Sequence, residues 1–126
     1  TNNLGAGNTA IGTSALLNNS IGFSNTAIGV SALANNTTGE YNNAIGVNAL
    51  LGNTIGDNNT AVGTSTDSGN FDASIILGRD ATATASNQFV TGSVGYPAGA
   101  VSVAAAAQTR TWDVIINGVA HKILLA

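Results

Sequence analysis

Apolar and polar residues along the first part of the chain repeat with a period of 17 residues. Each unit opens with a glycine and continues with a short alternating run of the type Asn-Thr-Ala-Ile-Gly. It then closes with a Ser-Ala-Leu segment and a stretch rich in Asn and Thr. A fixed period of this length indicates a repeat architecture. The most regular positions carry asparagine, a β-branched residue and glycine: Asn8, Ile11, Gly12, Asn25, Ile28, Gly29, Asn42, Ile45, Gly46, Asn59, Val62 and Gly63.

The alternating run predicts a very short β-strand in each unit. Thr9 and Ile11 fall on one face of this strand and Ala10 on the other. We expect the face with Ile11 to point inward. Glycine provides the corners, and the Asn pairs at 18–19 and 35–36 indicate turns. One unit therefore forms one coil of a parallel β-solenoid, in which equivalent residues stack about 4.8 Å apart as columns of Ile, of Ala and of Asn.

Two other architectures compete for the same pattern. The Ser-Ala-Leu-Leu segment is an acceptable helical fragment, but it has Gly and Asn around it and is far too short for a stable helix. A leucine-rich repeat requires a longer unit with more leucines. Both are rejected in favour of an all-β fold.

The period contracts after the fourth unit. Gly78 follows Gly63 by 15 residues, and Gly92 follows Gly78 by 14. We interpret these segments as degenerate coils that narrow the solenoid. The predicted organisation is four full coils over residues 1–71, two shorter coils over 72–95, and a C-terminal segment over 96–126.

The C-terminal segment contains a strong β-hairpin signal. Asn117 and Gly118 separate two apolar runs, and this dipeptide favours a two-residue type I′ turn. That turn would pair Ile116 with Val119, Val114 with His121, and Asp113 with Lys122. A lone hairpin is marginally stable, so we expect it to associate with its copies as a trimerisation cap on the end of the solenoid.

Composition narrows the range of functions. Only 7% of the 126 residues are charged, against roughly 25% in an average domain, and cysteine is absent. Isoleucine, valine and threonine at fixed places argue for an ordered chain.

The sequence also argues against some partners and targeting signals. The basic residues Arg79, Arg110 and Lys122 are isolated, which argues against nucleic-acid binding. No apolar run approaches the ~20 residues that cross a membrane. No signal peptide is evident, and we expect Thr1 to begin a fragment of a longer protein.

The small apolar content of each coil predicts association. A thin core of Ile, Ala and Leu barely offsets the entropy lost when a Gly- and Asn-rich chain is ordered. Small cores are usually supported by disulfides, metals or association, and the sequence offers no cysteine and no evident metal site. Association of several copies around an axis is the remaining means.

The segments Asn8–Ala15, Asn25–Ala32, Ile75–Ala81 and Ala85–Gly92 resemble the head repeats of YadA-type trimeric autotransporter adhesins, which are also similar to repeats in bacteriophage tail fibres. The resemblance spans roughly residues 5–92 and implies a left-handed parallel β-roll of three interlocked chains. The 17-residue period differs from the adhesin repeat, which is nearer 14. No segment of the given sequence resembles the adhesins' coiled-coil stalk or membrane-anchoring barrel. Its end from Trp112 resembles the closing segment of tail fibres.

The sequence offers little catalytic chemistry. His121 is the single histidine and is interpreted as structural or interfacial, so we expect no enzyme and no cofactor. Asp67, Asn70 and Asp72 have a spacing that could hold a hard cation, but they match no known calcium loop. A polar turn is the preferred interpretation of these three residues.

Two aromatic residues are candidates for surface binding. Phe23 and Tyr41 occupy adjacent positions in consecutive units, at a predicted corner. Their rings could stack on the faces of sugars, although packing within or between chains is the preferred interpretation.

The sequence therefore predicts an all-β, parallel β-solenoid with a C-terminal hairpin cap, assembled as an intertwined homotrimer. We expect an extracellular fibre segment, in a virion tail fibre or on a bacterial surface, that attaches to a host glycan or envelope receptor. The alternatives are a passive self-assembling filament or spacer rod, and an ice-binding solenoid. Ice binding is disfavoured because Asn43 interrupts the Thr column and because the alternation places that column inside with Ile.

Overall fold

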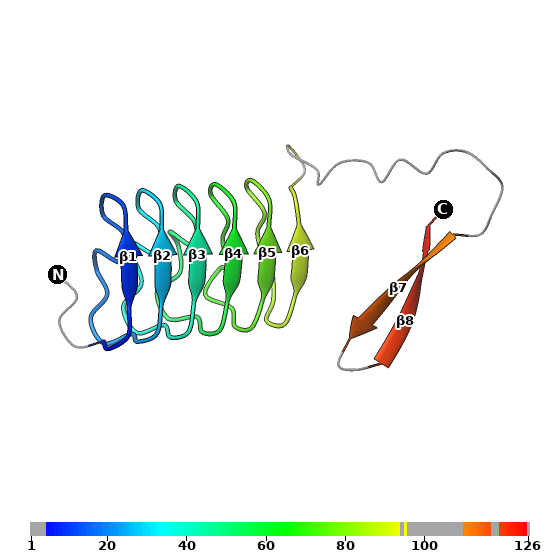
Figure 1. Ribbon diagram of the computed structural model, residues 1–126, viewed down its shortest axis with the longest axis horizontal. Helices are drawn as coiled ribbons and strands as arrows, with labels where there is room; N and C mark the ends of the chain where they lie inside the picture. The colour runs from blue at the N-terminus through cyan, green and yellow to red at the C-terminus, as the bar shows by residue number, and fades with distance from the viewer. Residues whose placement is uncertain (1–4, 94, 96–109, 117–118, 126) are drawn as a thin grey trace.

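The computed structural model describes residues 5–93, 95, 110–116 and 119–125. Six strands of three residues each lie side by side in one parallel sheet, in chain order (Figure 1). Between them the chain winds through one coil of a solenoid and returns to the sheet. The strands are β1 (Thr9–Ile11), β2 (Thr26–Ile28), β3 (Asn43–Ile45), β4 (Thr60–Val62), β5 (Ile75–Leu77) and β6 (Phe89–Thr91). The predicted all-β solenoid is confirmed.

The strand register follows the repeat. Ala27 pairs with Ala10 in β1 and with Ala44 in β3, so that equivalent residues of successive coils stand side by side. Hydrogen bonds between the same positions of neighbouring full coils span 17 residues. The span decreases to 15 residues between β4 and β5 and to 14 between β5 and β6, in agreement with the glycine spacing.

The direction of the side chains differs from the prediction. Ala27, Ala44 and Ala61 at the strand centres are fully buried, whereas Ile11 is 58% exposed and Ile45 is 42% exposed. The Thr and Ile positions therefore face outward and the Ala column faces inward. The alternation was correct, but the expected inward face was wrong, because in the coils whose interior also holds a leucine the strand centre has room only for a methyl group.

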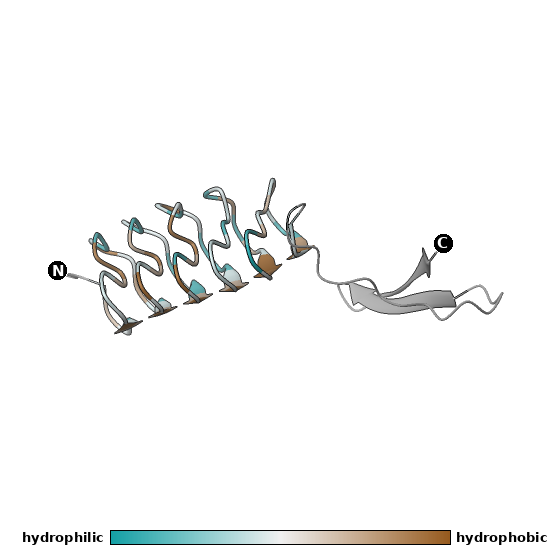
Figure 2. Cartoon of the chain, turned by 90° about the horizontal axis from the view of Figure 1, so that it is seen from above, coloured by the Kyte–Doolittle hydropathy of each residue, from teal (hydrophilic) through white to brown (hydrophobic). Residues whose placement is uncertain are grey.

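The core is consequently built from small residues and a leucine column. In the full coils, buried alanines at the strand centres pack with the leucines of the Ser-Ala-Leu segments. Figure 2 shows these hydrophobic segments at the same place in the first three coils, and shows β5 as a hydrophobic strand. Ile76 replaces the strand alanine in β5 and is also fully buried. The buried cluster consists of Leu16, Ala27, Ala32, Leu33, Ala44, Ala49, Leu50, Ala61, Ile76, Ala81 and Ala83.

The corner after each strand depends on left-handed backbone. Gly29 and Gly46 both have φ of 138°, a conformation that side-chain-bearing residues rarely adopt. The chain then alternates, because Ser31 has φ of 56° and Leu33 has φ of 50°. Leucine is unusual in this region, since its Cβ approaches the neighbouring carbonyl. Burial of the Leu33 side chain offsets that strain.

The C-terminal strands form a separate sheet of two strands. β7 (Arg110–Ile116) and β8 (Val119–Leu125) pair antiparallel. Ile116 pairs with Val119, and Asp113 pairs with Lys122, so the predicted register is confirmed. The predicted turn residues, Asn117 and Gly118, lie outside the described residues.

Candidate functional site

A ladder of buried asparagines runs through the four full coils. The side-chain oxygen of Asn25 accepts a hydrogen bond from the backbone N–H of Asn42 at 2.9 Å, and Asn42 repeats this contact with Asn59 at 2.9 Å. Asn8 begins the ladder with a 2.8 Å contact to the N–H of Asn25. Ser74 ends it by donating its N–H to Asn59 at 3.0 Å. These asparagines are therefore structural, and they satisfy backbone groups that have no partner within their own coil.

A second ladder lies in the turn that precedes each unit. The Nδ2 of Asn36 donates to the Oδ1 of Asn19 at 2.7 Å, and Asn53 donates to Asn36 at 3.0 Å. Ser68 continues the ladder with a 2.9 Å contact to Asn53. The sequence predicted turns at the Asn pairs, but this second ladder was not predicted there. The signal was present, because these asparagines also recur every 17 residues.

The two ladders meet at the glycine that opens each unit. The carbonyl oxygen of Gly39 accepts hydrogen bonds from the Nδ2 of Asn25 at 2.8 Å and from the Nδ2 of Asn36 at 2.9 Å. A Cβ on Gly39 would lie 2.4 Å from the Oδ1 of Asn36 and 2.6 Å from the carbonyl oxygen of Gly56. The close approach of two backbones, and not a positive φ, therefore requires glycine here.

The outer face of the parallel sheet carries several exposed apolar side chains. Its two outward columns contain several large side chains that a single chain leaves in contact with water. The exposed apolar residues of the strands are Ile11, Ile45, Val62, Ile75 and Phe89. Contiguous exposed apolar rows of this kind mark interaction surfaces.

A second group of exposed apolar residues lies in the turns. Leu17, Ile21 and Ile55 are each at least half exposed, and they belong to the loop half of the coil. Val30 and Val47 are also exposed, one position after the corner glycines. A single chain thus presents apolar side chains from two different parts of the coil.

The corner before the strand holds the two candidate aromatic residues. The Phe23 and Tyr41 rings lie 5.0 Å apart between centroids in an edge-to-face arrangement. The backbone supports the contact, because the N–H of Tyr41 donates to the carbonyl of Phe23 at 3.1 Å. Tyr41 is 49% exposed, whereas Phe23 is partly buried. The structure therefore brings the two predicted residues together as one surface feature.

The candidate cation ligands have other contacts. The Oδ1 of Asp67 accepts the N–H of Gly69 at 3.1 Å, and the Oδ1 of Asp72 accepts the N–H of Asp57 at 2.9 Å. The Oδ1 of Asn70 accepts both the N–H and the hydroxyl of Thr54, at 2.6 and 3.0 Å. Asn70 and Asp72 thus bond to the preceding coil. Across the described part of the chain, no group of three or more His, Cys, Asp or Glu residues is placed to hold a metal ion.

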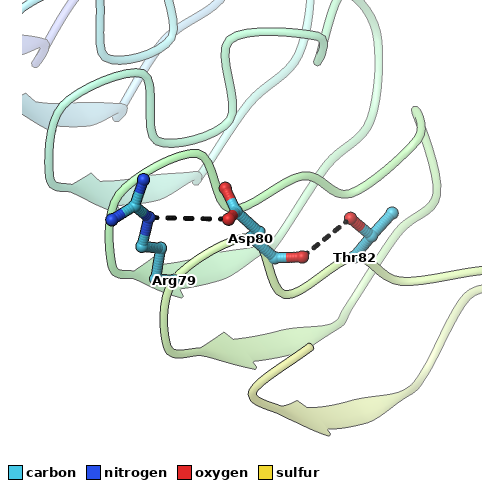
Figure 3. A network of polar contacts seen from close by, with 3 residues as sticks. All are labelled: Arg79, Asp80 and Thr82. Carbon is cyan, nitrogen blue, oxygen red and sulfur yellow. Dashed lines mark hydrogen bonds and ion pairs between the residues drawn. The ribbon is translucent and has the colours of Figure 1, made fainter. Parts of the chain in front are cut away.

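A small polar network follows β5. The Nε of Arg79 lies 3.5 Å from the Oδ2 of Asp80, and the hydroxyl of Thr82 donates to the carbonyl of Asp80 at 3.4 Å (Figure 3). The side chains of Arg79 and Asp80 are about half exposed. Exposed ion pairs of this kind contribute at most about 1 kcal/mol. This network lies on the surface of the fifth coil.

The geometry defines a class of protein: a parallel β-solenoid with a buried core of Ala, Leu and Asn. Comparison of the chain with protein-family models, curated proteins and solved structures finds no match in any of the three. Within the described residues, no helix has the length and apolar character that a membrane crossing requires. The side chain of His121 lies outside the part of the chain whose side chains are described.

Proposed function

We propose that the chain is a structural and receptor-binding segment of a fibre, in which three copies wrap around a common axis and attach to a host surface. The outward row of apolar residues on the parallel sheet carries this proposal. Ile11 and Phe89, at opposite ends of the sheet, are 58% and 68% exposed in the single chain. A sheet that faced only water would carry polar side chains at these positions.

Association gives these side chains a dry environment. Full burial of an Ile, Val or Phe side chain contributes roughly 1.5–3 kcal/mol, so a row that spans the sheet would supply a large part of the stability of the assembly. The core inside one chain consists largely of alanine and leucine and is thin by comparison. A partner on the outer face therefore supplies burial that the coil interior does not.

A ring of copies fits the distribution of apolar residues better than a twofold dimer. The strand face and the loop-half residues Leu17, Ile21 and Ile55 are different surfaces of one coil. Contact between two different surfaces is heterologous, and it forms a closed ring when the rotation allows. The resemblance to trimeric adhesin heads and tail fibres favours three copies, with the β7–β8 hairpins closing the C-terminal end together.

The proposed partner beyond the chain itself is a glycan or receptor of a host envelope. The same resemblance supports this assignment and an extracellular location, on a virion tail fibre or a bacterial surface. A passive filament or spacer rod is the structural alternative, since the outer face would serve assembly in either case.

Native mass spectrometry of the full chain, followed by binding to host envelope fractions, tests the proposal. We expect a three-chain species that withstands mild denaturant and binds at least one envelope fraction. Electron microscopy should show discrete particles. A folded monomer would overturn the trimer, and endless filaments without envelope binding would favour the rod.

Ice binding is the second candidate because the Thr column faces outward, against the sequence prediction. Thr9 is exposed, and Thr26 and Thr60 are partly exposed. Asn43 still interrupts the column, and Ile75 and Phe89 replace Thr in the last two coils. Thermal hysteresis of a solution of the chain would favour this second function, and its absence would leave the fibre proposal.

A further inference from the structure

Tyr41 occupies a position where the repeat otherwise places small residues or asparagine. Its equivalents are Gly7, Ser24, Asn58 and Ala73, which have φ of 71°, 53°, 59° and 55°. Tyr41 has φ of 56° in the same left-handed region, where a bulky side chain is an outlier. The other coils make the same corner without a ring. The aromatic side chain is therefore not needed for the backbone of this corner.

Phe23 is also a departure from its column. The equivalent residues are Ala6, Glu40, Asp57 and Asp72, none of which is aromatic. Phe23 and Tyr41 nevertheless meet across consecutive coils with their ring planes at 79°. In this edge-to-face geometry one ring braces the other, and the half-exposed Tyr41 keeps a surface open to solvent.

Two acidic residues flank the aromatic pair: Glu40 directly precedes Tyr41 in the sequence, and Asp57 occupies the equivalent position in the next coil. The backbone N–H of Glu40 donates to the Oδ1 of Asp57 at 2.8 Å. The carbonyl of Glu40 accepts the N–H of Asn58 at 2.9 Å. The described corner residues include no lysine or arginine, since Arg79 follows β5 at the other end of the strand. The corner is acidic and aromatic at once.

We propose that this corner, defined by Phe23, Glu40, Tyr41, Asp57 and Asn58, binds the face of a neutral sugar ring. Tyr41 provides the stacking surface and Phe23 holds it in place. The carboxylates of Glu40 and Asp57 accept hydrogen bonds from sugar hydroxyls, and the exposed Asn58, one coil beyond Tyr41, adds another. The inference rests on the proposed attachment function and assigns it a ligand class and a site.

The charges of the corner select among sugars. Uronic acids, sialic acids and sulfated sugars would bring negative charge to Glu40 and Asp57, and no lysine or arginine lies among the described corner residues to compensate. Like charges in close contact repel. A quaternary ammonium ligand also suits aromatic and acidic groups, but its usual site is a cage of several rings around the cation. The edge-to-face pair offers one stacking surface, which suits a flat sugar face.

Isothermal titration calorimetry on the full chain tests the assignment. The probes are neutral oligosaccharides of glucose, mannose and N-acetylglucosamine, with sialyllactose, a heparin oligosaccharide and choline as contrasts. Tyr41→Asn introduces the residue that Asn58 already provides at the equivalent position, so the roll should keep its circular-dichroism spectrum and melting temperature. We expect at least one neutral oligosaccharide to bind, and its affinity to fall at least about tenfold in Tyr41→Asn, as hot-spot aromatics behave.

Two matched variants separate stacking from other effects. Tyr41→Phe keeps the ring and should stay within about twofold of the parent affinity. Ser24→Asn places an asparagine at the same corner of the preceding coil, keeps both rings, and should leave binding unchanged.

Four results would overturn the inference. They are equal sugar affinity in Tyr41→Asn, preference for sialyllactose or heparin, binding of choline alone, and absence of binding to every neutral probe. None of these results touches the trimer or envelope binding, which native mass and the envelope fractions test separately.

Discussion

The side-chain oxygen of Asn42 accepts a hydrogen bond from the backbone N–H of Asn59, at 2.9 Å and one coil further along the solenoid. The same asparagine donates its Nδ2 to the carbonyl of Gly56 at 2.7 Å. Both groups are buried and both belong to the next coil. One side chain thus bonds two buried backbone groups of the next coil, and no other residue type in the repeat makes both contacts.

Replacement of Asn42 by alanine should therefore destabilise the roll strongly. The change leaves the N–H of Asn59 buried without this partner, and an unsatisfied buried group costs about 1–3 kcal/mol. The carbonyl of Gly56 also loses one of its two side-chain hydrogen bonds and keeps the one from Asn53 at 3.0 Å. We expect a loss of roughly 2–5 kcal/mol in the free energy of unfolding, measured by urea denaturation followed by circular dichroism.

Asn35→Ala is the matched control for this prediction. Asn35 is exposed and accepts a single 3.2 Å contact from Asn18. Its replacement should change the free energy of unfolding by no more than about 0.5 kcal/mol. Equal effects of the two substitutions would contradict the role assigned to the buried ladder.

Gly39→Ala should disrupt the coil by steric overlap. The added Cβ would lie 2.6 Å from the carbonyl oxygen of Gly56, which is backbone and has little freedom to move. We expect the protein either to lose several kcal/mol in its free energy of unfolding, seen as a lower melting temperature, or to fail to fold.

Gly52→Ala is the control. At Gly52 the nearest atoms to an added Cβ are the carboxylate oxygens of Asp67, both at 3.0 Å, and that side chain can turn aside. Gly52→Ala should accordingly melt within a few degrees of the parent, and a severe effect at Gly52 alone would contradict this account.

The coil and its register could be predicted from the sequence because they depend on periodicity. Every full coil repeats Asn, Ala, Ile or Val, and Gly at the same spacing, and only stacked strands align such residues. The contraction of the last coils was visible for the same reason, in the spacing of Gly63, Gly78 and Gly92. The Asn-Gly dipeptide likewise sufficed to predict the strand register of the hairpin.

The inner face of the strand could not be predicted from alternation alone. Alternation shows that Ala27 and Ile28 point in opposite directions, but the width of the coil decides which of them fits inside. Hydrophobicity favoured Ile28, whereas the available space favours Ala27, which is fully buried. An outward apolar column is favourable only when another surface covers it, and a single sequence carries no direct sign of that surface.

The left-handed backbone conformation of Leu33 also could not be predicted from the sequence. Propensity gives no reason to expect Leu33 at φ of 50°, and a short segment with leucine suggests helix. The leucine side chain points into the core only because Ser31 and Leu33 alternate with right-handed residues around the corner.

Leu33→Ala measures how much that side chain contributes. Leu33 is fully buried between the equivalent leucines Leu16 and Leu50. A leucine-to-alanine change in a packed core costs about 2–5 kcal/mol, and we expect the upper half of this range because a rigid stack collapses poorly around a cavity. Urea denaturation provides the measurement. Leu17→Ala, at the exposed neighbouring position, is the control; a larger loss for it in a monomeric sample would contradict the assignment of the core.

The last prediction concerns the outer face of the sheet. Ile45→Asp should abolish the proposed trimer, because it places a charge in the middle of the apolar row and a buried unpaired charge is costly. The coil itself should survive, since Ile45 lies outside the buried core cluster and its neighbour Ala44 remains buried. Native mass spectrometry should show the change from three chains to one.

Ala6→Asp is the control: it adds the same charge at an exposed corner, where the fourth coil already carries Asp57, and it should leave the assembly intact. If Ile45→Asp left the native mass unchanged, the outer face would not be the surface that joins the copies.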